Sequence, residues 1–203
     1  MTDGTGDPVL LVGIGVPDAA AAWEAIGCSV VDGAVPFANG ALLLGRSGIV
    51  VAGPCDATDL EGVPLATGDL VPAVAHASGA FELDHLVLLT DSLERTSEAV
   101  HRTLGLVRRR IRETDTVRQA FHRFADPPER THRGCIVEIV ESDRVQRTTL
   151  MGVVLNVTDL FDLADRLGPD VMSLPKPAVQ PGRYIATVRR DVGLGTAVAL
   201  MTP

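Results

Sequence analysis

Three stretches of the chain repeat one order of hydrophobic and polar positions. Each begins with an apolar run that predicts a strand, continues into an amphipathic helix that ends at a glycine, and closes with shorter apolar runs. The opening strands are expected at 9–16, 83–89 and 151–157. Strand, helix and then further strands is the order of a βαβββ module, so the pattern predicts an α+β fold made of three such modules.

The middle stretch carries the clearest helix signals. A Thr-Asp-Ser run at 90–92 supplies an N-cap, and Gly105 ends the helix. Between them an apolar stripe recurs at helical spacing, formed by Leu93, Thr96, Val100 and Leu104. The repeat of these signals favours modules over a generic α+β domain, which stays open as an alternative.

A dinucleotide-binding fold would also alternate strands and helices, but it needs a glycine fingerprint that binds the phosphates. The nearest match is Gly13-Ile14-Gly15, followed by Asp18 where a third glycine would be required. An anionic side chain at that turn would repel a pyrophosphate. The sequence therefore argues against this class.

The spacing of the repeats divides the chain. Residues 1–53 form a degenerate first module, and residues 54–81, rich in Pro, Gly, Asp and Ala, are expected to be a linker. Residues 82–203 then hold two paired modules, at 82–143 and 150–203.

Composition excludes several classes of protein. The formal net charge is −8, from 26 acidic and 18 basic residues among 203, which argues against nucleic-acid binding. Three cysteines without CxxC spacing favour neither a disulfide framework nor a thiolate zinc site. No apolar run reaches the ~20 residues that span a bilayer, and the first residues lack the basic start of a secretory signal. We therefore expect a cytoplasmic protein that binds neither nucleic acid nor membrane.

The order of motifs in the second and third stretches resembles the vicinal oxygen chelate superfamily, which includes glyoxalases, bleomycin-resistance proteins and extradiol dioxygenases. The motifs are DHLVLLTD at 84–91, RQAFHRF at 118–124, IVEIV at 136–140 and the closing run PGRYIATVRRDVGLGTAVALMTP at 181–203. The resemblance implies that two βαβββ modules lie side by side and form one curved sheet with a ligand-binding cleft.

The resemblance also implies four metal-ligand positions, one in the opening and one in the closing strand of each paired module. In the second module they hold His85 and Glu138, and imidazole and carboxylate suit a divalent metal ion. Glu138 would also be the catalytic residue. The other matching positions cannot bind a metal; they are Gly152 and Ala199 in the third module, and Val12 and Val51 in the first.

Because only two of the four implied positions hold metal-binding residues, the sequence does not decide whether the cofactor is a divalent metal ion. His122 could be a third ligand if its strand turns it toward the cleft. Otherwise His85 and Glu138 form a hydrogen-bonded pair in a cleft without metal. The small residues of the third module would open space for a small molecule, for which we expect Gln119, Tyr184 and Arg190 as binding residues. Strand alternation places Tyr184 and Arg190 on one face, and Arg183 and Arg189 on the other.

Three kinds of function follow from the resemblance. The chain could be a metal-dependent lyase, isomerase or dioxygenase, a metal-free protein that binds or sequesters a small molecule, or a remnant whose sheet serves assembly. A homodimer is expected, because three modules leave one without a partner in the same chain, and the runs at 9–16 and 48–53 are nearly continuously apolar. The alternative is a monomer in which residues 54–81 fold back over the first module.

Overall fold

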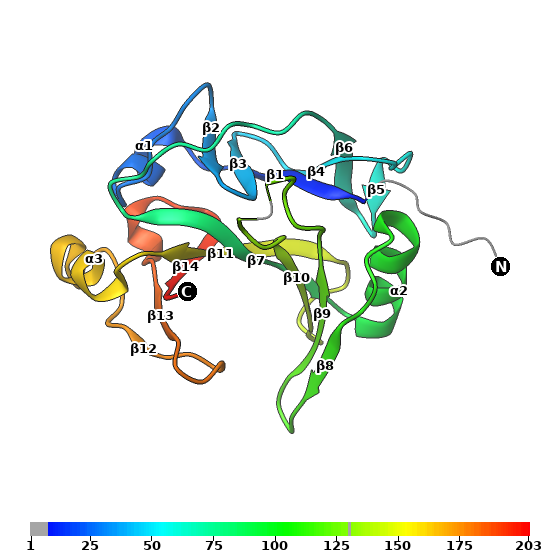
Figure 1. Ribbon diagram of the computed structural model, residues 1–203. Coiled ribbons are helices and arrows are strands. Elements are labelled where there is room, and N and C mark those ends of the chain that lie inside the picture. Colours follow the sequence, from blue (N-terminus) through cyan, green and yellow to red (C-terminus); the bar gives the residue numbers. More distant parts are fainter. Residues whose placement is uncertain (1–7, 130) are drawn as a thin grey trace.

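Two mixed sheets packed face to face make up the protein (Figure 1). The computed structural model describes residues 8–129 and 131–203; residues 1–7, over which the sequence predicts no secretory signal, lie outside the described part. The larger sheet has the strand order β12-β13-β14-β11-β7-β10-β9-β8, and the smaller has the order β2-β3-β1-β4-β6-β5. The predicted α+β class is confirmed.

The larger sheet consists of the second and third modules. The second comprises β7 (Ala80–Thr90), α2 (Leu93–Leu104), β8 (Arg110–Glu113), β9 (Arg118–Arg123) and β10 (Ile136–Glu141). The third comprises β11 (Thr149–Val157), α3 (Leu160–Leu167), β12 (Lys176–Pro177), β13 (Tyr184–Thr187), a 3-10 turn (Arg190–Val192) and β14 (Ala197–Met201). In each module the opening strand pairs in parallel with the closing strand, and β7 and β11 pair antiparallel at the centre.

The smaller sheet extends further along the chain than the sequence predicts. It comprises β1 (Leu10–Val16), β2 (Ala34–Phe37), β3 (Gly40–Leu44), β4 (Gly48–Ala52), β5 (Asp59–Leu60) and β6 (Val63–Thr67), with α1 (Ala20–Glu24) after β1. The segment 54–81, expected to be a linker, thus contributes β5 and β6. Its Pro and Gly content suggests coil, but Val63 and Leu65 alternate with exposed residues and bury one face of β6.

The smaller sheet repeats the topology of the larger one. In both, the central antiparallel pair (β1 and β4, or β7 and β11) is flanked by parallel partners (β3 and β6, or β10 and β14). Antiparallel strands follow outside them, β2 and β5 in one sheet, β9 and β13 in the other. The first part of the chain is therefore a reduced pair of modules without the two edge strands, and not one unpaired module.

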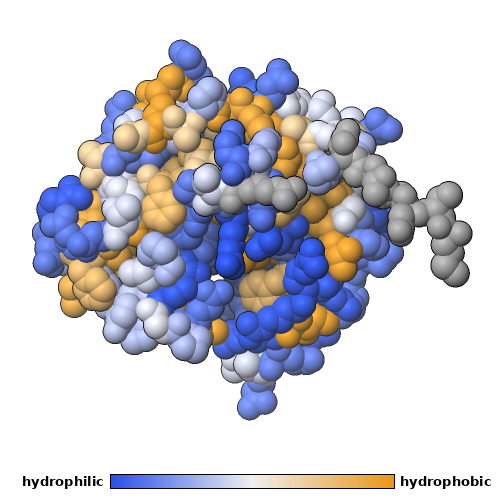
Figure 2. Space-filling view, viewed as in Figure 1, coloured by the Kyte–Doolittle hydropathy of each residue, from blue (hydrophilic) through white to orange (hydrophobic). Residues whose placement is uncertain are grey.

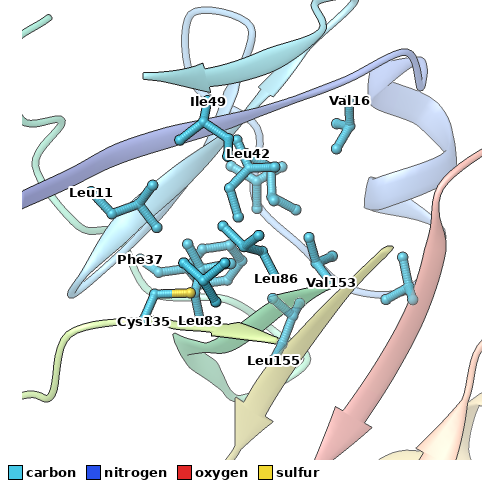
Figure 3. Packing of buried hydrophobic residues seen from close by; sticks show 14 of the residues in the cluster. Leu11, Val16, Phe37, Leu42, Ile49, Leu83, Leu86, Cys135, Val153 and Leu155 are labelled. Atoms are coloured by element: carbon cyan, nitrogen blue, oxygen red, sulfur yellow. The ribbon is translucent and has the colours of Figure 1, made fainter. Parts of the chain in front are cut away.

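The faces that carry the helices pack against each other and form the core. In Figure 3, Leu11, Phe37 and Leu42 of the smaller sheet lie against Leu83 and Leu86 of β7. All five side chains are buried. Each sheet thus covers the apolar back of the other within one chain. The homodimer prediction assumed that the first module leaves its sheet uncovered, whereas the larger sheet covers it within the same chain. The homodimer itself stays a prediction.

This packing leaves the opposite face of the larger sheet open. The hairpins β8–β9 and β12–β13 extend from it as two arms (Figure 1), and in the space-filling view they enclose a hollow with many hydrophilic residues (Figure 2). Over the described ranges, no helix is long and apolar enough to cross a membrane.

Asn39, in the turn between β2 and β3, joins the two sheets through three hydrogen bonds. Its side-chain amide donates to the carbonyl oxygens of Leu83 and Arg133 at 2.8 Å each, and its Oδ1 accepts from the Leu83 N–H at 2.8 Å. Asn39 is only 5% exposed. Because unsatisfied buried backbone groups cost free energy, this side chain fixes how the smaller sheet sits on β7.

Replacing Asn39 tests that role. We expect Asn39→Ala to lower the free energy of unfolding by roughly 2–4 kcal/mol, since it leaves three backbone groups without partners. Urea denaturation followed by circular dichroism measures the change. Gln146→Ala, at an exposed position, is the control; equal effects of the two substitutions would contradict the assigned role.

Candidate functional site

A cleft of about 570 Å³ lies on the open face of the larger sheet, between the two arms. Its floor comes from β7, β9 and β10, which present His85, Gln119 and Glu138. Neighbouring residues of these strands, such as Leu86 and Val137, belong to the core on the other face. Strand alternation thus places the polar residues on the cleft side.

His85 and Glu138 meet at the floor of the cleft. His85 Nε2 lies 3.2 Å from Glu138 Oε2, and both side chains are largely shielded from solvent, with 16% and 12% of their surface exposed. The two strands run in parallel with Glu138 opposite Val87, two residues beyond His85 on the same face. The structure therefore brings together the two residues that the resemblance pairs.

Gln119 and Arg112 fix the orientation of Glu138. Arg112 donates to Gln119 Oε1 at 2.7 Å, and the Gln119 amide group donates to Glu138 Oε1 in a short hydrogen bond. Since arginine can only donate, the Gln119 oxygen faces Arg112 and its NH₂ group faces Glu138. Gln119 thus lies in the cleft, as expected, where it holds a carboxylate.

Asp84 holds the other side of His85. Asp84 Oδ2 accepts a hydrogen bond from His85 Nδ1 at 2.7 Å, and Asp84 Oδ1 accepts one from Arg183 at 2.7 Å. Burial by itself would raise the pKa of Asp84, but hydrogen bonds and charge from His85 and Arg183 outweigh it and lower that pKa to about 2. Asp84 is therefore a carboxylate at neutral pH, and His85 Nδ1 carries a proton.

The floor of the cleft thus holds two groups that can take part in proton transfer, with 3.2 Å between His85 Nε2 and Glu138 Oε2. Both an imidazole nitrogen and a carboxylate oxygen can accept a proton, and each can donate it once it is protonated. The pair can then accept a proton from a bound molecule or donate one to it, which is general acid–base chemistry.

The structure places three other candidate residues outside the cleft. His122 is buried on the helix side of β9, where it contacts Ser97 Oγ at 2.9 Å and the Leu106 carbonyl oxygen at 2.7 Å. Burial lowers its pKa. It is therefore not a third metal ligand beside His85.

Tyr184 and Arg190 also differ from expectation. The Tyr184 ring packs edge-on against Phe161 of α3 with 5.1 Å between ring centroids, on the far face of β13. Strand β13 ends at Thr187, so Arg190 lies beyond it in an exposed turn. Neither residue lines the cleft. The alternation that placed Tyr184 on one face also placed Arg183 on the other, and Arg183 is the residue that contacts Asp84.

The ligand set that the resemblance implies is only half present. The 3.2 Å between His85 Nε2 and Glu138 Oε2 suits two ligands about 2.1 Å from one ion, and Asp84 orients the imidazole as carboxylates do beside metal-binding histidines. However, Gly152 and Ala199 supply no donor, and a side chain at Gly152 would collide with the Ala197 carbonyl oxygen.

No group of three or more His, Cys, Asp or Glu side chains converges anywhere in residues 8–129 and 131–203 to hold a metal. Catalytic metal sites use about three protein ligands and a water. The residues present therefore do not fit a resident metal ion.

The walls of the cleft combine positive charge with apolar surface. Arg110 and Arg112 line one side and Lys176 the other. The Arg110 guanidinium lies 5.8 Å from the centre of the Phe121 ring. In a chain of net charge −8, three cations around one cleft are a local positive region that attracts anions.

Comparisons with known proteins find similarity in structure alone. No protein-family model matches the sequence, and no curated protein is similar to it in sequence. Among solved structures, the methylmalonyl-CoA epimerase from Mycobacterium tuberculosis is 15% identical with a TM-score of 0.51, over 64% of this chain and 93% of that one. A Streptomyces coelicolor methylmalonyl-CoA epimerase variant in complex with 2-nitronate-propionyl-CoA is 18% identical, with a TM-score of 0.49, over 59% and 95%.

The similarity to the Mycobacterium tuberculosis structure supports the fold. The larger sheet has the paired βαβββ arrangement that the sequence motifs imply. At 15% identity the likeness to the Mycobacterium tuberculosis epimerase extends to the fold only. About a third of this chain lies outside that match, so its architecture goes beyond the single paired sheet.

The low pKa of Asp84 makes stability depend on pH. Its folded pKa of about 2 lies below the ordinary 3.8, so its contribution is present above about pH 4 and is lost as the pH falls toward 2. The shift corresponds to roughly 2 kcal/mol. We expect the stability gap between wild type and Asp84→Asn, measured by urea denaturation, to shrink by roughly two thirds of this amount between pH 5 and pH 2.5. Exposed Asp165→Asn is the control, and a constant gap for Asp84→Asn would contradict the prediction.

Proposed function

We propose that this protein binds a small molecule with an apolar body and an anionic, oxygen-bearing group in the cleft of its larger sheet. The observation that carries the proposal is the His85–Glu138 pair at the floor of a 570 Å³ cleft that three cationic side chains surround. Pockets of this size, with apolar walls and a few convergent polar groups, are typical of small-molecule sites.

The lining residues support both halves of that ligand. Ile136, Ile185 and Met201 provide apolar surface, while Arg110 and Lys176 can pair with an anion from opposite walls. Asp84 is paired with Arg183, and Glu138 on the floor offsets only one of the three cations Arg110, Arg112 and Lys176, so the lining keeps a positive balance. An anionic ligand is therefore favoured over a cationic one.

A second candidate function is catalysis of proton transfer, with Glu138 as the catalytic base. The observation that favours it is the 3.2 Å approach of His85 Nε2 to Glu138 Oε2, with Asp84 holding His85 and Gln119 holding Glu138. An isomerase or lyase that moves a proton next to a carbonyl group needs such a pair. Glu138→Gln would abolish this activity and still allow an anion to bind.

Calorimetry with three probes tests the binding function. We expect phenylpyruvate, which has a ring and a 2-oxo carboxylate, to bind more tightly than pyruvate, which lacks the ring, or 2-phenylethanol, which lacks the anion. Arg110→Gln should weaken phenylpyruvate binding about tenfold, because one charge-assisted contact is lost. Arg102→Gln, exposed on α2, is the matched control. Equal affinities for the three probes would contradict the proposal.

The incomplete ligand set predicts the metal content. Protein purified without added ions should hold well below one equivalent of any transition metal, since two side chains bind an ion weakly. Elemental analysis by mass spectrometry measures this, and His85→Ala should leave the result unchanged. A full equivalent that His85→Ala removes would instead favour a metal-dependent lyase, isomerase or dioxygenase.

A further inference from the structure

A second cavity, of about 470 Å³, lies in the seam between the smaller sheet and the connection from β9 to β10, which contributes Ala125, Pro127, Glu129, Thr131 and His132. We call it the seam cavity. Its apolar walls include Leu11 of β1, Phe37 of β2, and Leu70 and Val71 from the connection between the sheets. Leu70 is 43% exposed, which leaves apolar surface for a bound molecule to cover. Both size and lining suit a small molecule.

His132 supplies the polar end of the seam cavity. His132 Nδ1 lies 3.2 Å from Glu82 Oε2, and a carboxylate can only accept, so the proton of the neutral imidazole belongs on Nδ1. His132 Nε2 is then an acceptor for a hydroxyl group. The Glu82 carboxylate, which contacts His132, disfavours an anion at this end, and Glu129 adds a second acidic side chain to the lining. The seam cavity therefore selects a ligand chemistry different from that of the cleft.

Hydrogen bonds join the two cavities. Glu82 Oε1 accepts from the Asn156 amide at 2.7 Å, and the same amide lies 3.1 Å from Asp84 Oδ1. Asp84 in turn holds His85 on the floor of the cleft. A change in the hydrogen bonding of His132 thus has a continuous polar route to His85.

We propose that the seam cavity is a second small-molecule site, for a neutral apolar molecule that carries a hydroxyl group, and that its occupancy is transmitted to His85 through Glu82, Asn156 and Asp84. The ligand places its apolar body against Leu70 and Val71 and donates its hydroxyl proton to His132. By thermodynamic linkage, a molecule bound in either cavity then changes the affinity of the other cavity for its own ligand.

Histidine-labelled full-length protein and phenol test this by NMR at about pH 8, where an ordinary imidazole is neutral. Phenol should shift the His132 signal in a saturable way and should also shift His85. Toluene, without the hydroxyl group, and benzoate, with a charge, should each bind about tenfold more weakly or worse. Benzoate binding as tightly as phenol would overturn the assignment of the site.

Two variants separate the site from its link to the cleft. Val71→Trp fills the seam cavity and should abolish both shifts, while Val107→Trp, at a position 54% exposed outside it, should abolish neither. Glu82→Gln keeps the shape of the side chain but has one acceptor oxygen where Glu82 has two, so it cannot accept hydrogen bonds from both His132 and Asn156 in the same way. In this variant the His132 shift should persist and the His85 shift should disappear. A His85 shift that survives in Val71→Trp, or that Glu82→Gln leaves intact, would overturn the proposal.

Discussion

Burial of the two apolar sheet backs against each other is the constraint on which the rest of the structure depends. A paired βαβββ sheet has one face covered by helices at its two ends and leaves apolar surface between them. Here the smaller sheet fills that space, with Phe37 and Leu42 against Leu83 and Leu86. Because apolar burial is the main favourable term in folding, this packing fixes which face of the larger sheet remains open for a ligand.

This packing also gives β7 two roles, since the strand both contacts the smaller sheet and presents residues of the candidate site. One side of this strand meets the smaller sheet, and Asn39 binds the backbone of Leu83. The pairing of β7 with β11 is irregular at this point, and both Asp84 and His85 line the cleft. The strand that anchors the smaller sheet is thus the strand that presents the candidate site, so the position of Asp84 and His85 depends on how the two sheets fit.

In the candidate site, hydrogen bonds and an ion pair to Asp84 take the place of the metal ligation that the resemblance implies. The third module lacks metal ligands at Gly152 and Ala199, and instead contributes Arg183 and Asn156, which contact Asp84. These contacts keep Asp84 ionised and His85 oriented without an ion. A buried carboxylate between an imidazole and a guanidinium is well compensated, whereas the same carboxylate alone would be costly.

The sequence by itself determined the α+β class and the element order of the second and third modules, because strand periodicity and glycine-terminated helices are local signals. The approach of His85 to Glu138 was implied by the resemblance of the motifs to a known superfamily. The sequence did not reveal that 59–67 belongs to a sheet, or that Arg183 and not Arg190 contacts Asp84 beside the cleft. Those outcomes depend on where β6 and β13 pair and end, and the pairing partners are distant in sequence. Only the tertiary structure decided that the two sheets cover each other, since complementary apolar faces leave no pattern within either segment alone.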